Sequence, residues 1–210
     1  MIYRIHVSLD SPGGHGGWSE TTEPRKPTKG AERFYSTDHD CYPLGPLPKE
    51  LIKNIETHWM LFGYVSDVMP ISFNRISAEH FSGLPVLSKA MAEMYRDHSD
   101  GDCELIRVPK IWSRNLKQEV AAPFFLANVY RKIHTLDLER SGGKQTKNPR
   151  FANKFFVSTN PKMLRLNADF NGASGVWRDS NTSDWFCDDV FRHDIEAIAP
   201  SYYRFNEVQG

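Results

Sequence analysis

The second half of the chain is a succession of short β-type segments separated by turn residues, and this pattern limits the fold more than any other feature. The segments are rich in β-branched and aromatic residues, which favour strands. They read CELIRVPKIW, PFFLANVY, KIHTLDLERS, KFFVST, MLRLNADF, ASGVWR and SYYRFNEV, and MIYRIHVSLD at the start of the chain has the same character. PFFLANVY is apolar almost throughout, as in a central strand, whereas Pro109 predicts an edge or a bend.

Three other segments repeat their apolar residues at helical spacing. They lie in 47–62, where Gly63 would be the stop, in 82–98, and in 184–199 after a brief strand. Their apolar stripes are Leu51, Ile55, Trp59 and Phe62, then Leu87, Met91, Met94 and Tyr95, and finally Val190, Phe191, Ile195 and Ile198. Asp188 and Asp189 would begin the third helix, facing the positive end of its dipole. The sequence therefore predicts an α+β fold with a mainly antiparallel sheet, two helices in the N-terminal half and one C-terminal helix.

The length of 210 residues suits a single domain spanning 1–210, and the change from helices to strands near residue 100 is where a sub-boundary would fall. Glycine and proline dominate residues 11–46, which predicts a long surface loop. Within it, GGHGGW lacks the residues of a phosphate-binding loop. DHDC at 38–41 offers metal ligands without a second cluster. We therefore expect neither a metal nor another cofactor.

Charge and cysteine content exclude several classes of protein. The formal net charge is zero, so no global field attracts nucleic acid or an anionic membrane. Three widely spaced cysteines without a CxxC motif indicate free thiols in a reducing compartment. The first residues read as a strand and not as a signal peptide, and no apolar run reaches the roughly 18 residues that span a bilayer. We expect a cytoplasmic protein that binds neither membrane nor nucleic acid.

Residues 175–198, GVWRDSNTSDWFCDDVFRHDIEAI, concentrate aromatic and acidic side chains in one stretch. We interpret it as a packed corner of the domain: aspartates occupy a turn and a helix start, and Trp177 and Trp185 lie on either side of a tight reversal, where they can pair across a hairpin. The catalytic alternative would make Cys187 a nucleophile beside His193. Those residues are six apart, so they would not meet on one helix.

Four stretches of the C-terminal half form a set that resembles a known group of proteins. They are VWRD at 176–179, DWFCDDVFRHDIEAI at 184–198, YYRF at 202–205 and, upstream, FFLANVYRKIHTLDLERS at 124–141. Together they resemble immunity proteins of bacterial polymorphic toxin systems, mainly over residues 120–205. The sequence departs from that pattern at Cys187, where serine or threonine is expected, and at PSYY, where a glycine is expected before the last strand.

The resemblance implies a non-catalytic protein that binds a cognate toxin, encoded next to it, and occludes the toxin's active site. Many toxins that attack nucleic acid have basic clefts, so exposed acidic and aromatic residues suit the contact. On this ground we predict partner contacts at Trp18, Asp38, Asp40, Asp179, Asp184 and Trp185. A structural or adaptor domain with another protein partner is a further alternative.

A basic segment supports a different hypothesis. The loop 143–154 contains lysines and arginines that could contact phosphates, which would fit a small enzyme or binding protein acting on nucleic acid or nucleotides. These residues are Lys144, Lys147, Arg150 and Lys154, with Arg131, Lys132 and Arg140 expected nearby. A solvated loop is the simpler interpretation, because the neutral chain has no wider basic surface.

Overall fold

A computed structural model describes residues 1–7, 19–20, 45–58, 60–63, 85–108, 110–113, 117–120, 123–145, 147, 155–158, 160–182, 184–200 and 203–210. Within this part of the chain, no helix has the length and apolar character needed to cross a membrane. Most of the predicted loop 11–46, including the GGHGGW and DHDC motifs, lies outside the described residues, as does Pro109, where an edge or a bend was predicted.

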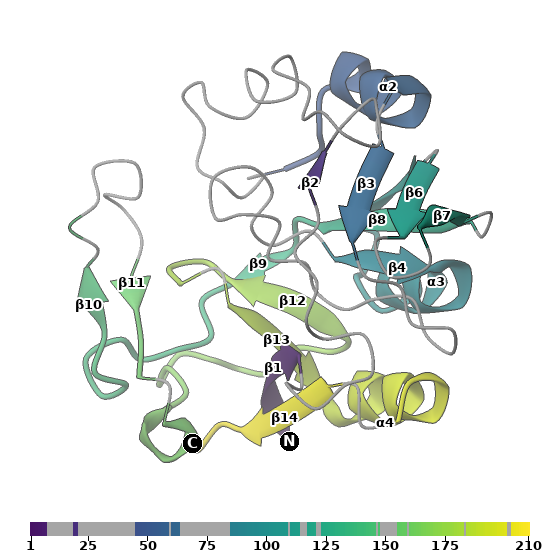
Figure 1. The fold of residues 1–210 in the computed structure, drawn as a ribbon. Coiled ribbons are helices and arrows are strands. Elements are labelled where there is room, and N and C mark those ends of the chain that lie inside the picture. Colours follow the sequence, from purple (N-terminus) through teal and green to yellow (C-terminus); the bar gives the residue numbers. More distant parts are fainter. Residues whose placement is uncertain are drawn as a thin grey trace.

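The largest sheet joins the two ends of the chain. Its strand order is β14-β1-β13-β12-β9 (Figure 1). The strands are β1 (Ile2–Val7), β9 (Lys132–Ile133), β12 (Val176–Asp179), β13 (Trp185–Asp188) and β14 (Tyr203–Glu207). Strand β1 runs antiparallel to both β14 and β13, β12 runs antiparallel to β13, and β9 lies parallel to β12. The first strand of the chain is therefore held between two strands from its last thirty residues.

The remaining strands form smaller sheets. β8 (Phe124–Val129) lies between β4 (Val86–Ser88) and β5 (Cys103–Val108), antiparallel to both. A second small sheet has the order β2-β3-β6-β7, with β2 (Ser19–Glu20), β3 (Met60–Gly63), β6 (Lys110–Ser113) and β7 (Gln118–Val120). β10 (Lys144–Gln145) and β11 (Phe155–Phe156) form a ribbon that projects from the body (Figure 1).

In the described part of the chain the helices are α2 (Lys49–His58), α3 (Lys89–Asp97) and α4 (Asp189–Ile198), with a short 3-10 turn, η2 (Pro161–Met163). Side chains at the N-caps define where two of them begin. The Ser88 hydroxyl accepts from the Met91 amide at 3.5 Å, and the Asp188 carboxylate accepts from the Phe191 amide at 2.9 Å. Asp188 thus begins α4, as predicted.

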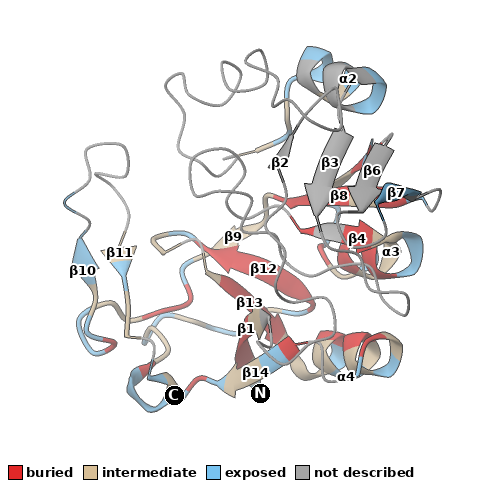
Figure 2. Ribbon diagram, viewed as in Figure 1, coloured by how far each residue is buried: buried red, intermediate tan, exposed pale blue. Residues whose placement is uncertain are grey.

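The main core lies where α3 and α4 meet the five-stranded sheet and β8, and Figure 2 shows the buried residues gathered there. Its fully buried members come from distant parts of the sequence. They include Leu87, Met91, Tyr95, Val129, Val176, Cys187, Phe191 and Ile195. The opposite face of the sheet packs on a second cluster of Leu136, Leu164, Trp177, Phe186 and Val208. Packing on both faces makes the sheet a rigid frame for the surfaces around it.

The α+β class and the mainly antiparallel pairing are confirmed, and PFFLANVY is the central strand of its sheet. The predicted ends of the first two helices are wrong. The stripe in 47–62 runs past His58 into β3, and Leu87 lies in β4, because α3 starts only at Lys89. Val190 is 58% exposed and does not belong to the buried side of α4.

Two predicted strands are largely replaced by irregular structure. KIHTLDLERS contributes only β9 and one isolated bridge at Leu136 before a turn. MLRLNADF begins in η2 and makes isolated bridges at Arg165 and Leu166. Their buried apolar residues, such as Leu136 and Leu164, lie in loops and pack in the second cluster. The alternating pattern therefore reflects side-chain burial and not pairing of the backbone in a sheet.

Candidate functional site

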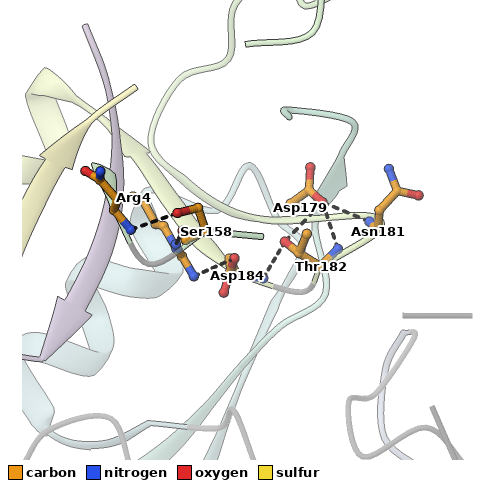
Figure 3. Close-up of polar contacts among 7 residues, drawn as sticks. Arg4, Ser158, Asp179, Asn181, Thr182 and Asp184 are labelled. Carbon is orange, nitrogen blue, oxygen red and sulfur yellow. Dashed lines mark hydrogen bonds and ion pairs between the residues drawn. The ribbon is translucent and has the colours of Figure 1, made fainter. Parts of the chain in front are cut away.

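The corner formed by β12, β13 and the turn between them is organised around Asp179, whose side chain is completely buried. One carboxylate oxygen accepts from the backbone amides of Thr135 and Leu136, at 2.9 and 3.1 Å. The other accepts from the amides of Asn181 and Thr182, at 2.9 and 2.8 Å (Figure 3). Charge-assisted bonds of this kind stabilise the turn and attach it to the segment after β9.

A second polar contact joins this corner to the first strand. The Arg4 guanidinium lies 2.9 Å from the Asp184 carboxylate and donates to the Ser158 carbonyl at 3.1 Å (Figure 3). Burial raises the pKa of the Asp184 carboxyl, and the positive charge of Arg4 acts in the opposite direction. Both side chains are largely enclosed, with 9% and 27% exposed, so this pair holds β1 against the corner and offers little surface.

The two tryptophans do not pair with each other, so this sequence interpretation is wrong. The β12–β13 register sets Trp177 opposite Phe186 and Arg178 opposite Trp185, which puts the indoles on opposite faces of the sheet. Trp177 donates to the Thr135 hydroxyl at 2.8 Å in the second cluster. Trp185 packs in the main core, with its ring 5.3 Å from the Arg178 guanidinium carbon. Each aromatic anchors a different core.

Cys187 lies on β13 and is fully buried, whereas His193 lies on α4 and is exposed. Burial raises the pKa of the Cys187 thiol and raises that of Cys103 to about 12. A thiolate nucleophile needs the opposite shift, a lowered pKa. Neither cysteine therefore has the environment of a reactive group.

This environment predicts slow thiol labelling in the folded protein. In a Cys41→Ser variant at about pH 8, a disulfide reagent should modify Cys103 on the order of a thousandfold more slowly than in denaturant, because the thiolate fraction falls tenfold per pKa unit. Cys187 should react only on unfolding. Absorbance of the released thiol measures both rates, and rapid modification of Cys187 in the native state would contradict its enclosure.

Outside the corner, two acidic segments meet on one side of the molecule. Residues 93–102, from the end of α3, and 188–196, from β13 and α4, contain eight acidic side chains and two arginines. The acidic residues are Glu93, Asp97, Asp100, Asp102, Asp188, Asp189, Asp194 and Glu196. α3 packs against α4, so the segments form one surface, which we call the acidic face. Six of the eight carboxylates form ion pairs with basic groups of the same chain, so the negative charge left over is smaller than their number suggests.

A shallow depression of about 230 Å³ lies in the acidic face. It is lined by Asp97, His98, Asp100, Arg131, Ser174, Gly175, Asp188 and Val190. His98 lies 3.2 Å from the Asp194 carboxylate, and Arg131 lies 3.4 Å from that of Asp100. Val190 adds an exposed apolar patch at the rim.

The structure brings together few of the residues predicted to contact a partner. Asp179 and Trp185 are buried, with 0% and 8% exposed, and both have structural contacts. Asp184 is half-buried beside Arg4. The other three, Trp18, Asp38 and Asp40, lie outside the described residues. Arg131 was expected beside the basic loop but lies in the acidic depression, whereas Lys144 and Lys147 are exposed on and beside β10.

Residues 75–210 match the Immunity protein family (Imm11), and the chain belongs to this family. The match confirms the resemblance seen in the sequence and extends it upstream to include α3 and the β4-β8-β5 sheet. No curated protein matches the chain. Membership in an immunity family points to a toxin as the partner.

Proposed function

We propose that the protein neutralises one cognate toxin of a bacterial polymorphic toxin system by binding it, without catalysis, and covering its active site. Family membership carries this proposal. The toxin would be encoded next to this chain and bound in the cytoplasm. Tight binding of this kind depends on a few buried anchors ringed by polar contacts.

The acidic face is the contact surface that the charge distribution favours. Three of its eight acidic residues, Asp97, Asp100 and Asp188, line the depression, and exposed Val190 is an apolar contact there. A toxin that attacks nucleic acid has a basic cleft, and opposite charge speeds the encounter with such a surface. Trp18, Asp38 and Asp40 remain predicted contacts from the sequence. Asp184 is a less favourable candidate because Arg4 neutralises it.

The test is co-expression with the toxin encoded beside this chain. The wild type should restore growth and form a one-to-one complex. A variant with Glu93→Lys and Asp97→Lys should slow association about tenfold or more, because like charges then face the toxin. The matched control, Glu50→Lys with Glu56→Lys, makes the same change on exposed positions of α2.

Association rates come from biolayer interferometry at two salt concentrations. Equal slowing by both double variants would reject the acidic face as the contact surface. Failure of the wild type to bind or neutralise the neighbouring toxin would reject the function itself. Loss of neutralisation by the α3 variant alone, with its fold intact by circular dichroism, is the expected result.

A further inference from the structure

The base of the β10–β11 ribbon gathers exposed side chains from three segments of the chain. Lys144 is directly opposite Phe156 in the antiparallel register, so their side chains are neighbours on one face. Met163, from η2, lies beside the ribbon. Its sulfur accepts from the Ser158 hydroxyl at 3.4 Å, and its methyl group is 3.7 Å from where a Cβ at Gly142 would be. Both contacts are within two positions of the Lys144–Phe156 pair.

Two of these side chains are apolar and face solvent. Phe156 is 63% exposed and Met163 is 45% exposed, and Figure 2 shows exposed positions on both strands of the ribbon. A single exposed apolar residue is ordinary, but two from different segments at one place indicate a contact surface. We call Lys144, Phe156, Met163 and the adjacent Lys162 the ribbon patch. All four lie in the described part of the chain.

The ribbon patch carries positive charge that is not neutralised by ion pairing. Lys144 and Lys162 are exposed, and neither forms an ion pair within the described residues. Arg165 donates to the carbonyls of Lys162 and Leu164 at 2.7 and 2.9 Å, which positions its guanidinium without cancelling its charge. The sequence has no acidic residue from 140 to 168. The patch is therefore a local excess of positive charge.

The basic groups near α3 and α4 differ from those of the ribbon patch, because they are paired. Like charges gathered on a surface repel one another, so the unpaired cations of the patch do not stabilise the fold, and an anionic ligand would remove the repulsion. The neutral net charge of the chain does not oppose such binding, since pairing accounts for many of its charges elsewhere. The paired cations are Lys89, Arg96, Arg131 and Arg192.

We propose that the ribbon patch binds single-stranded nucleic acid. A base stacks on the exposed ring of Phe156, and Met163 packs against that base. Lys144 and Lys162 hold the flanking phosphates. A nucleotide joins a flat base to a phosphate through one sugar, and Phe156 and Lys144 offer a ring and a charge at neighbouring positions in the same way. This match favours nucleic acid over an acidic protein surface.

The test is fluorescence anisotropy with a labelled oligothymidylate of about 12 nucleotides. The wild type should bind it at about 50 mM salt. The logarithm of the association constant should fall with that of the salt concentration at a slope of about −1.4, since each of two phosphate contacts contributes about −0.7. Lys144→Glu with Lys162→Glu should weaken binding at least about tenfold and abolish this slope. The matched control, Lys49→Glu with Lys53→Glu on exposed positions of α2, should bind like the wild type.

Changing Phe156 separates stacking from charge. Phe156→Ala should weaken binding about fivefold or more and leave the salt slope unchanged, because it removes a ring and no charge. Phe156→Tyr keeps the ring and should bind like the wild type. A duplex of the same length covers the faces of its bases, so it should bind more weakly and should not respond to Phe156→Ala.

A wild type that does not bind the oligothymidylate would overturn the proposal, as would equal weakening by the ribbon and α2 double variants. Equal binding of duplex and single strand, with no effect of Phe156→Ala, would also overturn it, because only general charge would remain. Circular dichroism confirms that each variant is folded.

This inference goes beyond neutralisation of a toxin. The ribbon variants should still restore growth in the co-expression assay, because their acidic face is intact. Absent oligonucleotide binding with intact neutralisation would reject this inference alone. Loss of neutralisation by a ribbon variant that binds the oligonucleotide like the wild type would assign the patch to the toxin and also reject it.

Discussion

Replacing Gly175 with alanine should lower the free energy of unfolding by about 4 kcal/mol or more, one of the largest losses available to a single methyl group. Gly175 has φ of 78°, a region that costs other residues. A Cβ at this position would lie 1.9 Å from the His98 carbonyl oxygen. That oxygen accepts from the Val176 amide at 2.8 Å, and the Gly175 carbonyl accepts from Asp188 at 3.0 Å, so the backbone cannot yield without breaking the start of β12.

Gly172→Ala is the matched control. Gly172 also has a positive φ, 97°, but no atom lies within 4 Å of the added Cβ. The free energy of unfolding of the control should therefore fall by only about 1–2 kcal/mol, the cost of placing alanine in a left-handed backbone conformation. Urea unfolding followed by tryptophan fluorescence measures both values. Similar losses for the two variants would show that the contact with His98 relaxes cheaply and that Gly175 is needed only for its backbone angle.

The β-rich pattern and the last helix could be predicted from sequence because their signals are local. Asp188 and Asp189 precede an apolar stripe, and the helix begins there. Leu87 was wrongly assigned to a helix because its position depends on contacts distant in the sequence. Its spacing from Met91 fits a helix, but Val86, Leu87 and Ser88 pair with β8, and tertiary hydrogen bonds override the helical pattern. Similarly, Leu136 and Leu164 have strand-like neighbours, yet they reach the core from loops.

The candidate surface could be only partly predicted, because it depends on long-range packing. Each half of the acidic face had a local explanation: DGD at 100–102 reads as a helix end, and Asp188 and Asp189 read as helix-start residues. The packing of α3 against α4 combines them, and no local pattern specifies that contact. The sequence indicated that Asp179 was an exposed aspartate in a turn. It is buried because it accepts hydrogen bonds from Thr135 and Leu136, over forty positions away, and no local pattern specifies those bonds.

Changing Asp179 to alanine should destabilise the fold by about 3–5 kcal/mol, since each buried donor left without an acceptor costs about 1–3 kcal/mol. Four backbone amides lose their acceptor. Those of Thr135 and Leu136 belong to fully buried residues, so water cannot replace the carboxylate without opening the core. Asp179→Asn keeps one carbonyl acceptor, but its NH2 group faces donors, so its loss should be smaller.

Asp137→Ala is the control, because it shows how much stability is lost when an exposed turn aspartate is removed. The Asp137 carboxylate accepts from the Arg140 amide at 2.9 Å in an exposed turn, where water can substitute. Its loss should be about 1 kcal/mol or less. Chemical unfolding of the three variants should rank them Asp179→Ala, Asp179→Asn and Asp137→Ala, from least to most stable. An Asp179→Ala protein as stable as Asp137→Ala would mean that the corner does not depend on this carboxylate.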